Sequence, residues 1–207
     1  MGLVKKAATT AAAAPSAERR DTARDLDGLL AQLRSDEAEQ RRLAALDLAG
    51  VTAAVPALLS AAREERQPVV RDAVLTTLVA HDLPEVAREL AGWLGDDDAV
   101  RRNAAVVALQ AMPNGAAAVL DELLTTGDVR VRTLAVMVLS TLPHPGVPDW
   151  LEVVVDADAD ENVVAAAVDT AQQLEDGLAR QLATAAAARF PDNPYLRFLA
   201  TLAAGAR

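Results

Sequence analysis

The side chains that could perform chemistry in this sequence are few and far apart. Cysteine is absent, which excludes a thiol nucleophile, a disulfide scaffold and any cysteine-ligated metal. The two histidines, His81 and His144, lie far apart in the sequence and without clustered carboxylates, so they are expected to be surface loop residues. We therefore expect no catalytic residue, no cofactor and no metal site.

Two groups of closely spaced acids could also bind a metal ion. Asp96, Asp97 and Asp98 are consecutive, and Asp156, Asp158 and Asp160 alternate with alanine. The second group resembles a calcium loop at first sight, but it lacks the glycine and the distal glutamate of an EF-hand. Both groups are better explained as turns between helices that end in N-cap residues.

Arginines recur at a regular interval and could grip an anion or an acidic partner. The alternative is structural, with each arginine paired to an acid of its own repeat or of the next one. The spacing of Asp98 to Arg102 and of Asp128 to Arg132 permits such a pair within one helix. We favour the structural interpretation, in which each exposed pair contributes only a few tenths of a kcal/mol.

These arginines belong to a repeat with a period near 30 residues. Its copies are residues 40–49, 70–79, 101–110, 131–140 and 163–172, whose second position is Arg41, Arg71, Arg102, Arg132 and then Val164. Small or apolar residues fill the fourth, fifth and ninth positions, which lie on one stripe of a helix. Acidic or amide residues four positions before the arginine suit a helix start: Glu37, Gln67, Asp98, Asp128 and Asp160.

A second set of helices is expected between the repeated ones. They are predicted near 22–34, 51–64, 84–95, 114–126, 146–155 and 176–190, with turns rich in proline, glycine and aspartate between them. The run Val153 to Val155 is the best local candidate for a strand, but it is short and sits in a helix position. Each repeat is therefore two helices joined by a short turn.

The repeated pattern, an acid followed by V-R-x-x-A-A-x-x-L, resembles the HEAT repeat, and its short period resembles the subtype known from phycobilisome lyase proteins. The clearest copies run from Asp98 to Leu109 and from Asp128 to Leu139; the copy from Asp160 departs by having Val164. The resemblance implies an all-α fold, a right-handed α-solenoid of about five helix pairs with a C-terminal capping helix pair. It says almost nothing about activity, since one fold carries many functions.

Three regions are expected along the chain. Residues 1–20 are basic and rich in alanine, which predicts a disordered leader or, alternatively, a docking peptide. Residues 21–175 form the solenoid. Residues 176–207 resemble a tetratricopeptide-type helix pair, which would cap the exposed core of the last repeat; a separate site for a peptide terminus is the alternative.

The third, seventh and tenth positions of the repeated helices are expected to form the concave surface of the stack. In the centre of this surface Val107 and Met137 stand among uncharged polar residues, as in a contact surface. The alternative is a helix phase shifted by one position, which would place both in the core. The residues expected to bind a protein partner are Asp72, Thr76, Asn103, Val107, Thr133, Met137 and Asp169.

Composition narrows the function further. The net charge of −10 and the scarcity of aromatic residues argue against nucleic acid as a partner. No apolar run is long enough for a membrane span, and the bias toward alanine and arginine is typical of a bacterial, GC-rich genome. We expect a cytoplasmic, non-catalytic scaffold or adaptor that binds another protein. The alternative, from the subtype resemblance, is a chromophore-lyase-like or chaperone subunit that assists maturation of another protein.

Overall fold

The computed structural model describes residues 25–174 and 176–205. The expected leader, residues 1–20, therefore lies outside the described residues, and its interpretation stays a prediction. Within the described part every regular element is helical, with twelve α-helices, one short 3-10 helix (Thr52–Ala54) and no strand. The α-helices are α1 (Leu26–Gln32), α2 (Ala38–Asp47), α3 (Val55–Glu64), α4 (Pro68–Val79), α5 (Pro84–Trp93), α6 (Ala99–Gln110), α7 (Pro113–Thr125), α8 (Val129–Leu139), α9 (Val147–Ala157), α10 (Glu161–Ala171), α11 (Asp176–Arg189) and α12 (Pro194–Gly205).

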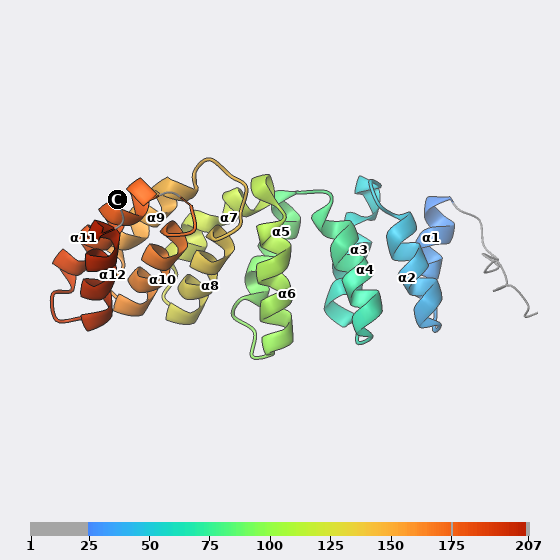
Figure 1. Ribbon diagram of the computed structural model, residues 1–207. Coiled ribbons are helices and arrows are strands. Elements are labelled where there is room, and N and C mark those ends of the chain that lie inside the picture. Colours follow the sequence, from blue (N-terminus) through green and yellow to red (C-terminus); the bar gives the residue numbers. More distant parts are fainter. Residues whose placement is uncertain (1–24, 175, 206–207) are drawn as a thin grey trace, which may run out of the picture.

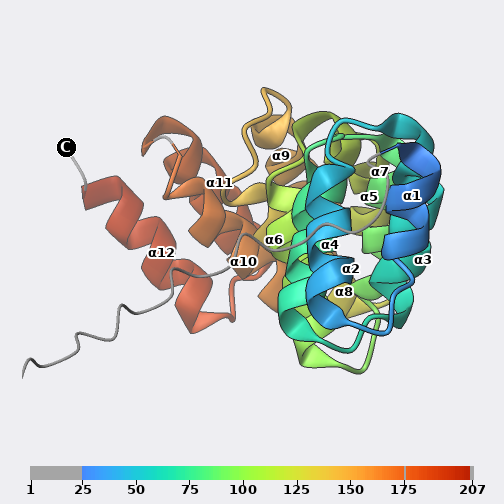
Figure 2. The same cartoon turned by 90° about the vertical axis from the view of Figure 1, so that its right-hand side faces the viewer.

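The helices alternate between two layers of an elongated stack. Figure 1 shows the even-numbered helices in front and the odd-numbered helices behind them. Each helix packs against its partner in the pair, and most also pack against the next helix of their own layer, as α2 does on α4 and α5 on α7. Figure 2 shows the C-terminal pair displaced toward the side of the even-numbered helices, so this layer lines the concave side of a crescent. The expected all-helical solenoid is confirmed.

Local sequence explains where the helices begin. Asp98, Asp128 and Asp160 are the N-cap residues of α6, α8 and α10, and each side chain accepts a backbone N–H of the first turn. Proline occupies the first turn of α3, α4, α5, α7 and α9, where its missing N–H has no intrahelical partner to lose. The run Val153 to Val155 lies inside α9, as expected.

The core follows the predicted columns of the repeated helices. The fifth and ninth positions are buried in every copy: Ala44, Val74, Ala105, Ala135, Ala167, and Leu48, Leu78, Leu109, Leu139, Ala171. Four of the five residues at the fifth position are alanine, whose short side chain lets neighbouring helices approach closely. The fourth position is buried only at Ala73 and is half-buried in the other copies, so it forms the margin of the stripe.

Aromatic and histidine side chains pack between the helix pairs. Trp93 is buried and its indole N–H donates to Glu89 at 3.2 Å, while Trp150 donates to Asp121 at 2.8 Å. Both histidines lie in connections between helices, as expected, but neither is a fully exposed surface residue. His144 is half-buried against the Trp150 ring, and the Nε2 atom of His81 is buried without a hydrogen-bond partner in the described structure.

The described residues contain neither a membrane-spanning helix nor a clustered metal site. No helix there is both long enough and apolar enough to pass through a membrane. No group of three or more histidine, aspartate or glutamate side chains in the same residues has the arrangement of a metal site.

Candidate functional site: the concave surface

The residues expected to bind a partner come from one face of four neighbouring helices, α4, α6, α8 and α10. We call this face, the third, seventh and tenth positions of each repeat, the concave surface. Asp72, Thr76, Asn103, Val107 and Met137 are exposed, and Thr133 and Asp169 are half-buried. None of the seven lies in the core, so the structure brings them together along one continuous side of the stack.

Two large apolar side chains stand at the centre of the concave surface. Val107 on α6 is 66% exposed and Met137 on α8 is 48% exposed. The alternative that the helix phase is shifted and that both are core residues is therefore wrong. Each occupies the seventh position of its repeat, where the neighbouring α4 and α10 carry Thr76 and Asp169.

The polar groups around these two residues are bonded to the stack itself. Gln110 on α6 donates to the carbonyl oxygen of Met137 at 2.8 Å and to the Ser140 hydroxyl at 3.3 Å, which ties α6 to α8. The hydroxyl groups of Thr76 and Thr133 each donate to a carbonyl oxygen of their own helix. Around Val107 and Met137 the donors of Gln110, Thr76 and Thr133 are thus already satisfied, and the surface suits apolar contact more than hydrogen-bond recognition.

The concave surface continues onto α12, which the sequence predicts to be part of a capping helix pair or, alternatively, of a separate site for a peptide terminus. Tyr195, Phe198 and Leu202 are 46%, 58% and 53% exposed. The Tyr195 hydroxyl lies 2.9 Å from both carboxylate oxygens of Asp169, so it shares a face with the seventh position of α10. Their spacing of i, i+3 and i+7 places them on one face of the helix, as the spacing of i, i+4 and i+7 does for the concave positions in the repeats, a signal that was present in the sequence.

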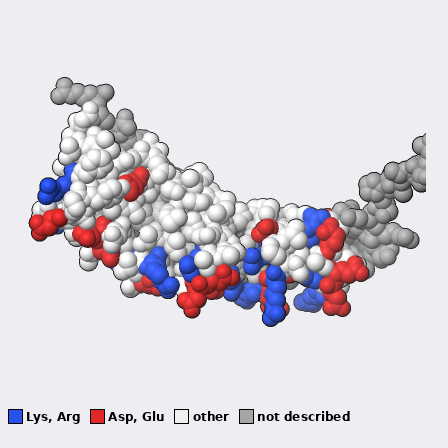
Figure 3. Space-filling view, turned by 60° about the horizontal axis from the view of Figure 1, so that its bottom comes forward, with Lys and Arg blue, Asp and Glu red and all other residues white. Residues whose placement is uncertain are grey.

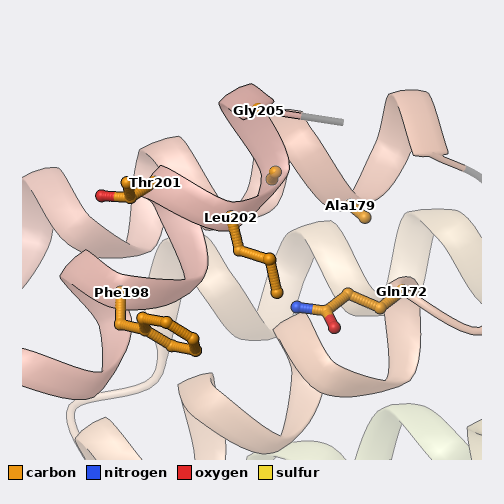
Figure 4. Close-up of a pocket in the computed structure, with 7 residues that line it drawn as sticks. Gln172, Ala179, Phe198, Thr201, Leu202 and Gly205 are labelled. Atoms are coloured by element: carbon orange, nitrogen blue, oxygen red, sulfur yellow. The ribbon is translucent and has the colours of Figure 1, made fainter. Parts of the chain in front are cut away.

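A pocket of about 640 Å³ opens at this C-terminal end. Figure 4 shows Phe198 and Leu202 on α12 bordering it, with Ala179 from α11 and with the amide of Gln172, after α10, directed toward Leu202. The lining is mostly apolar and no charged side chain contributes to it. An apolar side chain of a partner could enter here.

Charge is scarce on the concave surface. Figure 3 shows the hollow side of the crescent nearly without charged side chains, which gather along the opposite edge. In the three concave positions of the five repeats the acids are Asp72 and Asp169, and the one arginine, Arg42, is paired with Glu39. The Tyr195 hydroxyl bound to Asp169 has its pKa raised, first by that hydrogen bond and then by burial.

The arginines at the second position of the repeats, which we call the arginine column, lie at the turns within the helix pairs. Two of them link neighbouring helix pairs. Arg41 donates to both carboxylate oxygens of Glu65 at 2.7 and 3.1 Å, and Arg132 does the same to Asp158 at 2.7 and 3.0 Å. Pairing with an acid of the same repeat or of the next one was expected, and these two arginines pair with the next repeat; the pairs that helical spacing permits, Asp98 with Arg102 and Asp128 with Arg132, are absent from the described residues. Those two aspartates cap helices instead, and the acceptor lies six positions before the second position of the next repeat, which is Arg71 for Glu65 and Val164 for Asp158.

The accepting acids are also fixed by their own turns. Glu65 accepts the N–H of Gln67, and Asp158 accepts the N–H of Asp160, both at 2.8 Å. The hydrogen bonds from Arg41 and the backbone lower the pKa of Glu65 against the opposing effect of burial. For Asp158 burial alone would raise the pKa, but the bonds from Arg132 and Asp160 outweigh it and lower the pKa. Both acids are therefore held ionised.

The middle of the column lacks these links. The position that would accept from Arg102 is Thr126, which has no carboxylate, and among the described residues Arg102 donates only to the carbonyl oxygens of Asp96 and Asp97, both at 2.8 Å. The Nε atom of Arg71 is buried without a partner in the described structure, because Asp96 pairs with Arg101 instead. The arginine column thus links neighbouring helix pairs at Arg41 and Arg132 but not at Arg71 and Arg102. It lies outside the concave surface.

The comparisons with known proteins concern the N-terminal half of the described stack. Residues 26–110 match the sequence model of a family described as HEAT repeats. The match does not single out the short-repeat, lyase-like subtype, and a comparison with curated proteins finds no match. Beyond residue 110 the same alternation of helices continues to α12. The family match and the two-layered helical stack together support a HEAT-repeat protein.

Proposed function

We propose that this protein is a non-catalytic scaffold that binds another protein along its concave surface. The observation that carries the proposal is the exposure of Val107 and Met137, side by side on α6 and α8, on a face with few charges. Exposed apolar residues rimmed by polar ones are typical of protein contact surfaces, and methionine adapts its shape to a partner.

The C-terminal aromatic residues extend the same surface. Phe198 and Leu202 supply further apolar area, and the adjoining pocket offers a place for one large side chain of the partner. Large apolar anchors that enter pockets dominate the affinity of many protein interfaces. The partner therefore presents a mostly apolar and uncharged stripe, long enough to run from α6 to α12.

The proposal is tested by substituting the two central residues together, Val107→Glu with Met137→Glu. The matched control is Val153→Glu, because Val153 on α9 is 52% exposed and lies in the layer of odd-numbered helices. The wild-type protein, the double variant and the control are each immobilised and exposed to extract of the native cell. A photo-reactive residue at position 107 then identifies proteins that lie directly on the surface.

The expected result is a partner captured by the wild-type protein and by the Val153 variant but lost by the double variant. All three proteins must keep the same unfolding midpoint, since exposed positions tolerate charge. A partner that binds the double variant as well as the wild type would refute the assignment of the concave surface. So would crosslinks from position 107 to no protein at all.

A further inference from the structure

We propose that residues 1–24 of this chain occupy its own concave surface and that the protein partner must displace them. The inference rests on the proposed function for its consequence, because a displaced segment regulates binding only where a partner uses the same face. The contact itself needs no partner and can be observed directly. Its basis is charge, length and the spacing of acidic groups along the stack.

Charge is the first argument. Residues 1–24 contain the basic residues Lys5, Lys6, Arg19, Arg20 and Arg24 and only two acids, whereas the whole chain has a net charge of −10. On the concave surface the acids are Asp72 and Asp169, and Asp72 has no side-chain partner among the described residues. The arginine present there, Arg42, is bound to Glu39. A basic segment would therefore find carboxylate acceptors on this surface. The arginine in the concave positions is already paired and would not repel it strongly.

Spacing is the second argument. Asp72 on α4 and Asp169 on α10 are separated by three helix-to-helix steps, or about 24–30 Å at the usual spacing of 8–10 Å. Lys6 and Arg19 are separated by thirteen residues, which span about 20 Å as a helix and about 43 Å when extended. The two basic clusters can thus reach the two acids at once in a partly extended form.

The residues between the two basic clusters are small and uncharged, which is compatible with the apolar surface between Asp72 and Asp169. Residues 7–17 are alanine and threonine with one proline and one serine, all small and uncharged. Between Asp72 and Asp169 the surface presents Val107 and Met137, which are apolar and exposed. A small-residue segment can approach them closely, yet it buries little area, so a partner with larger side chains displaces it.

Length is the third argument and favours the same chain over a second copy. The 24 residues that precede Asp25 span about 80 Å when extended, whereas α2 to α12 covers five steps, about 40–50 Å. The segment can therefore run the length of its own concave surface from its attachment before α1. Docking within one chain has a high effective concentration, which compensates for weak individual contacts.

The experiment uses paramagnetic broadening in the full chain. Because the chain has no cysteine, Ala12→Cys gives a single site for a nitroxide label, and the methionine methyl groups serve as reporters. Met137 reports on the concave surface, and the reference is its own intensity after the label is reduced. The inference expects the Met137 signal to lose most of its intensity with the oxidised label and to regain it on reduction.

Three controls make the result decisive. Asp72→Lys should restore the Met137 signal, whereas Asp97→Lys, an exposed acid at the turn before α6, should not. Salt at 1 M, where the Debye length is about 3 Å, should also restore it. Labelled protein mixed with isotope-labelled, nitroxide-free protein should leave Met137 unaffected; broadening there would show a second copy as the occupant and overturn the inference.

Unchanged Met137 intensity in the labelled full chain would overturn the inference as well. The proposed function would survive that result, because the capture experiment with the Val107 and Met137 variant does not involve residues 1–24. If the double variant captured the partner as well as the wild type did, while the Met137 signal was still broadened, the partner site would be refuted. The contact within the chain would then still be supported. The two hypotheses therefore fail separately.

Discussion

Replacing Asp158 by alanine should remove the strongest staple between two helix pairs. The Asp158 side chain is only 3% exposed, and it accepts two bonds from Arg132, whose side chain is 13% exposed, and one from the N–H of Asp160. Alanine would leave the guanidinium and that N–H without a carboxylate. Breaking a buried pair from one side costs about 3–5 kcal/mol, and we expect about 3 kcal/mol because Arg132 keeps its bond to Thr126.

The measurement is urea unfolding followed by far-ultraviolet circular dichroism. The control is Arg130→Met, which removes an ion pair to Asp128 whose side chains are 58% and 41% exposed, and which should cost less than about 0.5 kcal/mol. The double variant Arg132→Met with Asp158→Ala should lose less than the sum of the two single losses, because no charge is then left unpaired. An Asp158 variant as stable as the Arg130 variant would refute the stapling role.

The same pair gives the stability a defined dependence on pH. Asp158 and Glu65 have lowered pKa values in the folded protein, so their contribution is fully present above the unfolded carboxyl pKa near 4. It is lost as the pH falls below that value and through the lower folded pKa. The wild-type protein should therefore lose stability below about pH 4, and the Asp158→Ala variant should lose less over the same range. Parallel curves for the two proteins would contradict this assignment.

Three further predictions concern other parts of the stack. Thr126→Asp should supply the acceptor that Arg102 lacks and raise the free energy of unfolding by up to about 1 kcal/mol; no gain, or the same gain in an Arg102→Met background, would count against it. Asp82→Ala should cost about 1–2 kcal/mol in urea unfolding, because the carboxylate caps the start of α7 through Asn114 and Gly115, whereas Asp82→Asn keeps the positive φ of 46° and should cost less. Asp169→Asn should lower the pKa of Tyr195, measured by absorbance at alkaline pH on the single tyrosine of the chain, and an unchanged titration would contradict the hydrogen bond.

The repeat could be predicted from sequence because stacking imposes one periodicity on every copy. The columns at Ala105 and Leu109 are apolar for the same reason in each repeat, and the N-cap column at Asp98 follows from the start of the same helix. The helix phase therefore placed Val107 and Met137 correctly on the surface.

What the sequence did not predict depends on contacts between different repeats. The acceptor of Arg132 could be taken for Asp128, four positions away, because helical spacing alone does not show that Asp158 of the next turn lies closer. The half-buried place of His144 comes from contact with Trp150, which lies in the following helix. The exposure of Phe198 was missed because a terminal helix was expected to cover apolar surface, not to present it.

The gaps in the arginine column have a mechanical consequence. Ion pairs tie α2 to the turn before α4, and α8 to the turn before α10, but none of this kind among the described residues ties α4 to α6 or α6 to α8 at that edge. At the opposite edge Asp82, after α4, holds the start of α7. The middle of the stack therefore lacks one kind of link that both of its ends have, and we expect the stack to bend more readily there, which would change the width of the hollow that faces a partner.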